Sequence, residues 1–92
     1  MHTVELLEEA IALAQMLGYE VRLEALDGHA GSCVVAGRKL LLVDLAASPA
    51  ERLDTVLDAL REESFAKGFA QAVDERTLSP ALRRLVVRRR AA

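Results

Sequence analysis

Aromatic residues are scarce in this chain of 92 residues, which has one Tyr, two Phe and no Trp. The core must therefore be built from Leu, Val and Ala, and few stacking platforms remain for bases, sugars or flavins. A single cysteine, Cys33, excludes an internal disulfide framework and a thiolate-rich metal cluster. The longest apolar run, residues 10–14, is far shorter than the roughly 20 residues that cross a bilayer.

Targeting and nucleotide-binding signals are also missing from the sequence. The first residues carry Glu5, Glu8 and Glu9 and no basic cluster, unlike a signal or transit peptide. No GxGxxG, GK[ST] or GxSxG motif occurs. With 52% apolar and 28% charged residues, the composition is that of a globular domain. We expect one cytoplasmic domain over residues 1–92 that contains no membrane-spanning segment.

The charges are distributed unevenly along the chain. Residues 1–63 hold five basic and twelve acidic side chains, whereas residues 64–92 hold seven basic and two acidic ones. Such a tail can bind a nucleic acid or another anionic partner, or an acidic face of its own chain. The acidic body, the few aromatics and a pI near 5.6 disfavour nucleic acid. The arginines of the tail are Arg83, Arg84, Arg88, Arg89 and Arg90.

The first half of the chain changes from helical to alternating periodicity. Residues 3–17 are predicted to form a helix that Thr3 caps and that ends before Gly18. Strict alternation of apolar and charged side chains then predicts a half-buried strand over residues 19–25.

Two further apolar runs predict a β-hairpin. Residues 32–36 and 39–43 flank Gly37-Arg38, and a glycine at the first turn position favours a type II′ turn. This register pairs Val34 with Leu41. We expect the three strands to form one antiparallel sheet.

The clearest local signal is a helix start at residue 48. Ser48, Pro49 and Glu51 have the spacing of a capping box with proline at the first helical position. An apolar stripe follows, and the opposite side of the helix is acidic. The acidic side chains are Asp54, Asp58 and Glu62.

The C-terminal third is less regular. Residues 64–78 fit either a continued helix or a break. Ser79-Pro80 repeats the helix-start signal and predicts a basic C-terminal helix over residues 79–92, which we expect to lie near the acidic side chains of the helix from Pro49. The fold class is therefore α+β: an N-terminal helix, a three-stranded antiparallel sheet, a capped amphipathic helix and a short C-terminal helix.

Candidate catalytic groups are few. His29 and Cys33 are four residues apart, with Asp27 nearby, and could form a thiolate–imidazole pair, but a loop histidine and a buried strand thiol are the better interpretation. The acidic side of the helix from Pro49 lacks the converging oxygen ligands that a cation site needs, so a solvated or arginine-docked face is the better interpretation.

The order of the elements is similar to a known enzyme family. A strand that ends Leu41-Leu42-Val43-Asp44 leads into a capped helix, and residues 52–62 of that helix read RLDTVLDALRE. This pattern, over residues 4–63, resembles the minimal core of the zincin-like HExxH metallopeptidases. An amphipathic helix that merely follows a hairpin would produce the same order.

The resemblance fails at the residues that carry the chemistry. Asp58 stands where the family has its first zinc-binding histidine, Ala59 replaces the general-base glutamate, and Glu62 replaces the second histidine. Peptide hydrolysis needs the two imidazoles and the carboxylate. The resemblance therefore implies a degenerate, non-catalytic scaffold, and we predict no catalytic, cofactor or metal site.

The remaining hypothesis is a non-enzymatic interaction or scaffold module that self-associates as a homodimer. The hairpin has two apolar faces, with Val34, Leu41 and Val43 on one, and a chain this small gains core by dimerising. Binding of an anionic partner through the arginine-rich C-terminus is the alternative. The candidate interaction residues are Val34, Leu41, Val43, Leu82, Leu85, Val86, Arg83, Arg84 and Arg88.

Overall fold

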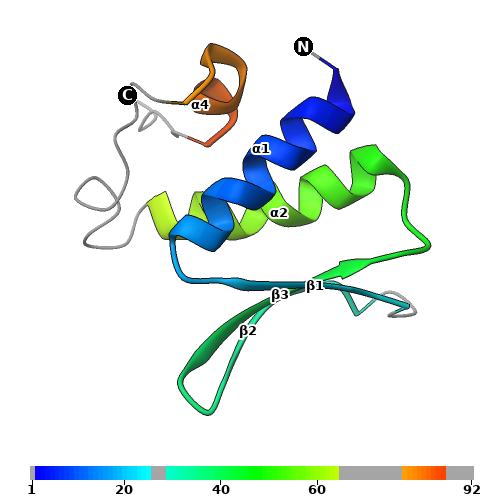
Figure 1. Cartoon of the computed structure of the whole chain (residues 1–92), viewed down its shortest axis with the longest axis vertical. Helices are drawn as coiled ribbons and strands as arrows, with labels where there is room; N and C mark the ends of the chain where they lie inside the picture. Colours follow the sequence, from blue (N-terminus) through cyan, green and yellow to red (C-terminus); the bar gives the residue numbers. More distant parts are fainter. Residues whose placement is uncertain (1, 26–28, 65–77, 87–92) are drawn as a thin grey trace, which may run out of the picture.

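The computed structural model describes residues 2–25, 29–64 and 78–86 of the chain. Within these ranges three helices and three strands build an α+β fold, as the sequence predicts (Figure 1). In chain order they are α1 (Thr3–Met16), β1 (Glu20–Glu24), β2 (Gly31–Val35), β3 (Arg38–Asp44), α2 (Pro49–Ser64) and α4 (Pro80–Val86).

The elements form three layers. Helices α1 and α2 pack against each other and cover one face of the sheet, and α4 packs on both helices from the side away from the sheet (Figure 1). The opposite face of the sheet has no helix over it within the described part of the chain. None of the described helices combines the length and the apolar character that a membrane span needs.

The sheet is mixed, so the prediction of an entirely antiparallel sheet is wrong. The strand order is β1-β3-β2, in which β3 pairs antiparallel with β2 and parallel with β1. The physical reason lies in β3, which is the longest strand and holds an unbroken run of four apolar residues, 40–43, that gains most from the central position. Because the hairpin places β2 on one side of β3, β1 must take the other side, and its parallel register runs from Glu20 opposite Leu40 to Glu24 opposite Asp44.

The hairpin turn lies one residue earlier than predicted. Val35 pairs with Arg38 across a two-residue turn, Ala36-Gly37, whose φ angles of 52° and 77° are both positive, as a type I′ turn requires. The predicted type II′ turn at Gly37-Arg38 is therefore wrong, and Val34 pairs with Lys39 instead of Leu41. A shift of two residues in the pairing keeps the faces unchanged, so Val34 still shares a face with Leu41.

The ends of α1 show one correct and one wrong prediction. At the C-terminus Gly18 has a φ of 96°, and its N–H donates to the Gln15 carbonyl while the Tyr19 N–H donates to the Ala14 carbonyl. These two bonds are a Schellman motif, the termination that Gly18 predicts. At the N-terminus the cap residue is His2, which makes no side-chain capping bond, so Thr3 is not the cap.

Both predicted Ser-Pro helix starts are confirmed. In α2 the Ser48 N–H donates to Glu51 Oε1 and the Glu51 N–H donates to Ser48 Oγ, each at 3.2 Å, which completes the capping box. In α4 the Leu82 N–H donates to Ser79 Oγ at 3.1 Å. Of the ambiguous residues 64–78, Ser64 ends α2 and Leu78 is buried, and residues 65–77 lie outside the described ranges, as do the last residues of the predicted helix 79–92.

The core is aliphatic and draws on every layer. Leu41 and Val43 of β3 are fully buried beneath the helices, and Leu82 and Val86 of α4 are fully buried on the other side of the helix pair. No polar or charged side chain of the described residues is buried with them. The other buried residues are Leu7, Ala10, Leu13, Ala14, Leu53, Val56, Leu57, Ala59, Leu60 and Leu78.

Removal of the α4 anchor should destabilise the fold. Leu82→Ala leaves a cavity between α4 and the helix pair, so we expect the free energy of unfolding to fall by about 2–5 kcal/mol. Chemical denaturation measures this change. Arg84→Ala, at an exposed position of the same helix, is the control and should change it by no more than about 0.5 kcal/mol. If Leu82→Ala lowered the free energy of unfolding by no more than about 0.5 kcal/mol, as the control does, α4 would not be part of the core.

The hairpin turn should be improvable. Ala36 occupies the left-handed region at a cost of about 1–2 kcal/mol, whereas Asn tolerates that region and Asn-Gly is a preferred type I′ pair. We expect Ala36→Asn to raise the free energy of unfolding by about 0.5–1 kcal/mol, measured by denaturation. Ala36→Val should lower it, because β-branched residues are strained at positive φ. Destabilisation by Asn would contradict the turn geometry.

Candidate interaction surface

The helices leave one face of the sheet uncovered. This face is polar along β1 and apolar along β3 and β2. The register places charged residues of β1 next to leucines of β3, and Cys33 and Val35 of β2 beyond them. This face, which we call the open face, thus becomes apolar from β1 towards β2. Its members are Glu20, Arg22, Glu24, Gly31, Cys33, Val35, Arg38, Leu40, Leu42 and Asp44.

The apolar side of the open face is accessible. Val35 is 55% exposed and Cys33 is exposed, whereas Leu40 and Leu42 are half-buried. Val34 lies on the helix-covered side of the sheet, yet it is 70% exposed, because the hairpin extends past the helices (Figure 1). The end of the hairpin therefore presents apolar side chains on both of its faces.

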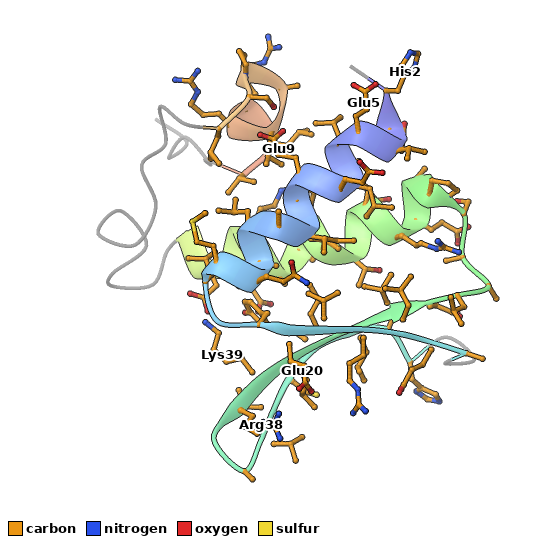
Figure 2. All side chains as sticks on the ribbon, viewed as in Figure 1. His2, Glu5, Glu9, Glu20, Arg38 and Lys39 are labelled. Atoms are coloured by element: carbon orange, nitrogen blue, oxygen red, sulfur yellow. The ribbon has the colours of Figure 1, made fainter. Side chains whose placement is uncertain are left out.

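Ion pairs occupy the polar side of the open face. Arg38 Nη2 lies 2.8 Å from Glu20 Oε1 and joins β3 to β1 (Figure 2). Arg22 Nε lies 3.8 Å from Glu24 Oε1 within β1. All four side chains are largely exposed, and such pairs contribute about 0–1 kcal/mol each. Of the two pairs, only the one between Arg38 and Glu20 links neighbouring strands.

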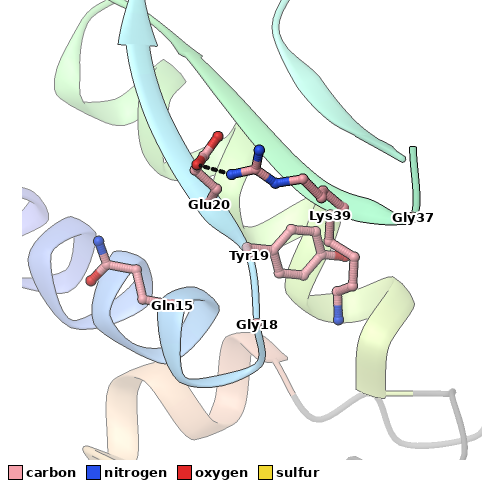
Figure 3. Close-up of a pocket in the computed structure, with 7 residues that line it drawn as sticks. Gln15, Gly18, Tyr19, Glu20, Gly37 and Lys39 are labelled. Atoms are coloured by element: carbon pink, nitrogen blue, oxygen red, sulfur yellow. Dashed lines mark hydrogen bonds and ion pairs between the residues drawn. The ribbon is translucent and has the colours of Figure 1, made fainter. Parts of the chain in front are cut away.

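A pocket of about 430 Å³ opens where α1 ends and the sheet begins (Figure 3). The side chains around it come from the last turn of α1, the start of β1 and the start of β3. Its lining residues are Gln15, Gly18, Tyr19, Glu20, Gly37, Arg38 and Lys39.

Lys39 connects four elements at this pocket. Its Nζ lies 2.7 Å from Glu63 Oε1 of α2, donates to the Leu17 carbonyl at 2.9 Å, and sits 4.4 Å from the centre of the Tyr19 ring. A cation here satisfies a free carbonyl at the negative C-terminal end of α1. Tyr19 OH donates to the same Glu63 oxygen at 3.3 Å, which is long for a hydroxyl donor.

These contacts make the pocket a structural junction more than an anion site. Lys39 is paired with Glu63 and Arg38 with Glu20, so neither cation is available without breaking an ion pair. The C-terminal end of α1 adds negative potential. We call the group of Tyr19, Lys39 and Glu63 the Lys39 junction. The sequence carries no signal for it, because Lys39 and Glu63 are 24 residues apart on different elements.

The environment of the junction raises the pKa of Tyr19 from 10.0 to about 12. Desolvation of the half-buried ring is the main cause. The negative charge of Glu63, the hydrogen bond to that carboxylate and the more distant charge of Glu62 act in the same direction.

Helix α4 is held by polar contacts at both ends. The Ser79 N–H and Oγ donate to the two carboxylate oxygens of Glu9, at 2.9 and 2.6 Å. Arg61 Nε donates to the Leu85 carbonyl at 2.9 Å. The expected pairing of the basic helix with Asp54, Asp58 and Glu62 is not found for Arg83 and Arg84, which make no ion pair within the described residues.

The predicted interaction residues fall into separate environments. Val34 is exposed, whereas Leu41, Val43, Leu82 and Val86 are fully buried in the core of their own chain. Burial makes these four unavailable as surface residues. Leu85 and Arg83 are half-buried on α4, Arg84 is exposed there, and Arg88 lies outside the described residues.

The residues considered for catalysis do not form a constellation. His29 and Cys33 are both exposed, with no hydrogen bond between them among the described contacts. On α2, Asp58 and Glu62 are exposed and Ala59 is buried. Over the described ranges, no group of three His, Cys, Asp or Glu side chains converges to hold a metal ion.

Comparison of the chain with models of known protein families, with curated proteins and with solved structures found no match.

The raised pKa of Tyr19 should be visible as a late titration. Since Tyr19 is the single tyrosine of the chain, its phenolate absorbance should rise with a midpoint near pH 12 instead of 10. Folding favours the protonated phenol, so this contribution to stability is complete below pH 10 and is lost as the pH rises towards 12.

Glu63→Gln should move the midpoint part of the way back towards 10, because the desolvation remains. Glu8→Gln, on the exposed surface of α1, is the control and should leave the midpoint unchanged. A midpoint near 10 in the native protein would contradict the geometry of the Lys39 junction.

Proposed function

We propose that the protein is a non-enzymatic interaction module that self-associates through the apolar side of the open face and the end of the hairpin. The observation that carries this proposal is the position of α4. Leu82 and Val86 of α4 are buried against α1 and α2, on the far side from the sheet. The apolar side of the open face therefore has no cover from α4.

The exposure pattern supports a docking surface. Val34 and Val35, 70% and 55% exposed, are adjacent in one strand at the end of a hairpin that extends past the helices. Single exposed apolar residues are ordinary, but neighbouring ones on an extending element are typical of an interaction site.

The size of the chain supports a partner of the same kind. A domain of this length buries a modest fraction of its surface, and a twofold dimer is the commonest way to bury more. The resemblance to a zincin-like core without its histidines is compatible with such a scaffold role, since Asp58, Ala59 and Glu62 supply no hydrolytic chemistry.

Self-association is tested by light scattering across a hundredfold dilution. We expect a mass of twice 10.0 kDa at the high end of the series. Val35→Lys places a charge on the apolar side of the open face and should shift the mass to that of the monomer, because a charge desolvated at an interface is costly.

Val4→Lys is the matched control. Val4 is 51% exposed, close to the value for Val35, but it lies in the first turn of α1, remote from the sheet (Figure 1). This variant should dimerise like the native protein, and circular dichroism should show both variants folded. A native mass that stays monomeric at the highest concentration would refute the proposal.

A further inference from the structure

We propose that two copies of the chain join through the free edge of β2, by antiparallel β2–β2 pairing about a twofold axis at Cys33, to form one continuous six-stranded sheet. This inference rests on the proposed self-association and assigns its geometry. It follows from the difference between the two edges of the sheet, which the order β1-β3-β2 defines.

The two edge strands differ in charge. β1 reads Glu-Val-Arg-Leu-Glu and carries a charge at every second residue, the pattern that protects an edge against pairing with another chain. β2 reads Gly-Ser-Cys-Val-Val, with no charge and no proline, and Ser32 to Val35 are all exposed. Of the two edges of the sheet within the described ranges, the β2 edge is therefore the one whose sequence gives no protection against strand addition.

The backbone groups at the β2 edge follow from the hairpin register. Across a two-residue turn, Val35 and Arg38 form a hydrogen-bonded pair, so Val35 and Cys33 direct their N–H and C=O groups towards β3. Ser32 and Val34, which alternate with them, direct theirs outwards. An incoming strand must bond to Ser32 and Val34.

A second copy of β2 satisfies this requirement along its whole length. When Cys33 lies opposite Cys33 of the other copy, Ser32 faces Val34 and all five residues of the strand are paired. Pairings shifted by two residues leave part of the strand without a partner. The register centred on Cys33 is thus the one that forms most hydrogen bonds.

Side-chain fit and charge favour the same register. Val35 lies opposite Gly31 of the other copy, where a Cβ would meet nothing within 4 Å, so there is space for the valine. An uncharged strand against an uncharged strand brings no like charges together. The apolar halves of the two open faces become continuous across the junction, and both edges of the resulting sheet are charged β1 strands. The assembly is therefore closed at two copies.

Thiol cross-linking of the full-length protein measures the register. Cys33 is the only thiol, and in this non-hydrogen-bonded pair the two Cα atoms would be about 4.5 Å apart, within the range of a disulfide. Diamide accepts the two electrons and two protons that the thiols lose when the S–S bond forms. We expect a covalent dimer to form at least about tenfold faster than by random collision.

The rate of cross-linking by random collision is measured with variants in which the single cysteine lies at another residue. Val4→Cys in a Cys33→Ser background places it on α1 at similar exposure, and Ser32→Cys in that background places it one residue off the axis. Both should cross-link slowly. Faster cross-linking at residue 32 than at residue 33 would overturn the register.

A lysine placed on β2 tests whether this strand forms the interface between the two copies. Val34→Lys should yield monomers in light scattering, whereas Leu23→Lys, at an exposed position of β1 on the same side of the sheet, should leave the dimer intact. A native dimer that survives Val34→Lys and cross-links no faster than the control would overturn β2 pairing but not self-association. A native monomer would overturn both.

Discussion

The burial of one side of a single strand, β3, organises the rest of the molecule. Leu41 and Val43 are completely covered, and two helices are needed to cover them. The apolar face of α2 is wide, because this helix buries residues at successive spacings of three, one, two and one from Leu53 to Leu60. The sheet and α1 cover part of that face, and the rest needs a further layer. Helix α4 supplies that layer and is for this reason absent from the open face of the sheet.

The Lys39 junction holds the end of α1 against the first residues of β1 and β3. The Schellman turn at Gly18 directs the chain out of α1 into β1, and Lys39 of β3 bonds to the carbonyl left free at Leu17. The same ammonium group is paired with Glu63 near the end of α2. One side chain thereby ties the end of α1 to the strand that lies beside β1. Such a tie favours β1 next to β3, and it is formed between residues that are distant in sequence.

Local signals in the sequence were sufficient to predict that the helices and the hairpin form, but not the position of every helix cap and turn. The capping box at Ser48 and the glycine after α1 each depend on residues a few positions apart, and both are found. The alternation in β1 is found only in part, because Val21 is half-buried but Leu23 is exposed. The predicted Thr3 cap failed because the helix begins one residue earlier, so that the cap position falls on His2, and a shift of one residue is within the usual variation of helix ends. The turn was misplaced because Gly37 fits either position of a two-residue loop, and only the pairing energy of the whole hairpin decides between them.

Strand order and the polar contacts depend on long-range packing, which the sequence pattern does not encode. Val35 is exposed because α4 lies on the helices and not on the open face, and Val34 is exposed because the hairpin extends past the helices. The bond between Glu9 and Ser79 joins residues 70 positions apart. The predicted interaction residues that turn out to be buried are aliphatic, and so are the residues of an apolar interface, so the residue type does not tell the two apart. Leu41 and Leu82 differ from Val35 in what covers them, not in chemistry.

The corrected strand order changes what the uncharged strand can do. In an antiparallel sheet built in chain order, β2 would be the central strand, both of its edges would be paired, and its lack of charge would be ordinary for an interior strand. In the observed order β1-β3-β2 the same five residues form an edge, where lack of charge is unusual because edges attract other strands. The parallel pairing of β1 with β3 therefore puts an uncharged segment at an edge of the sheet, and the proposed β2–β2 pairing starts from that observation.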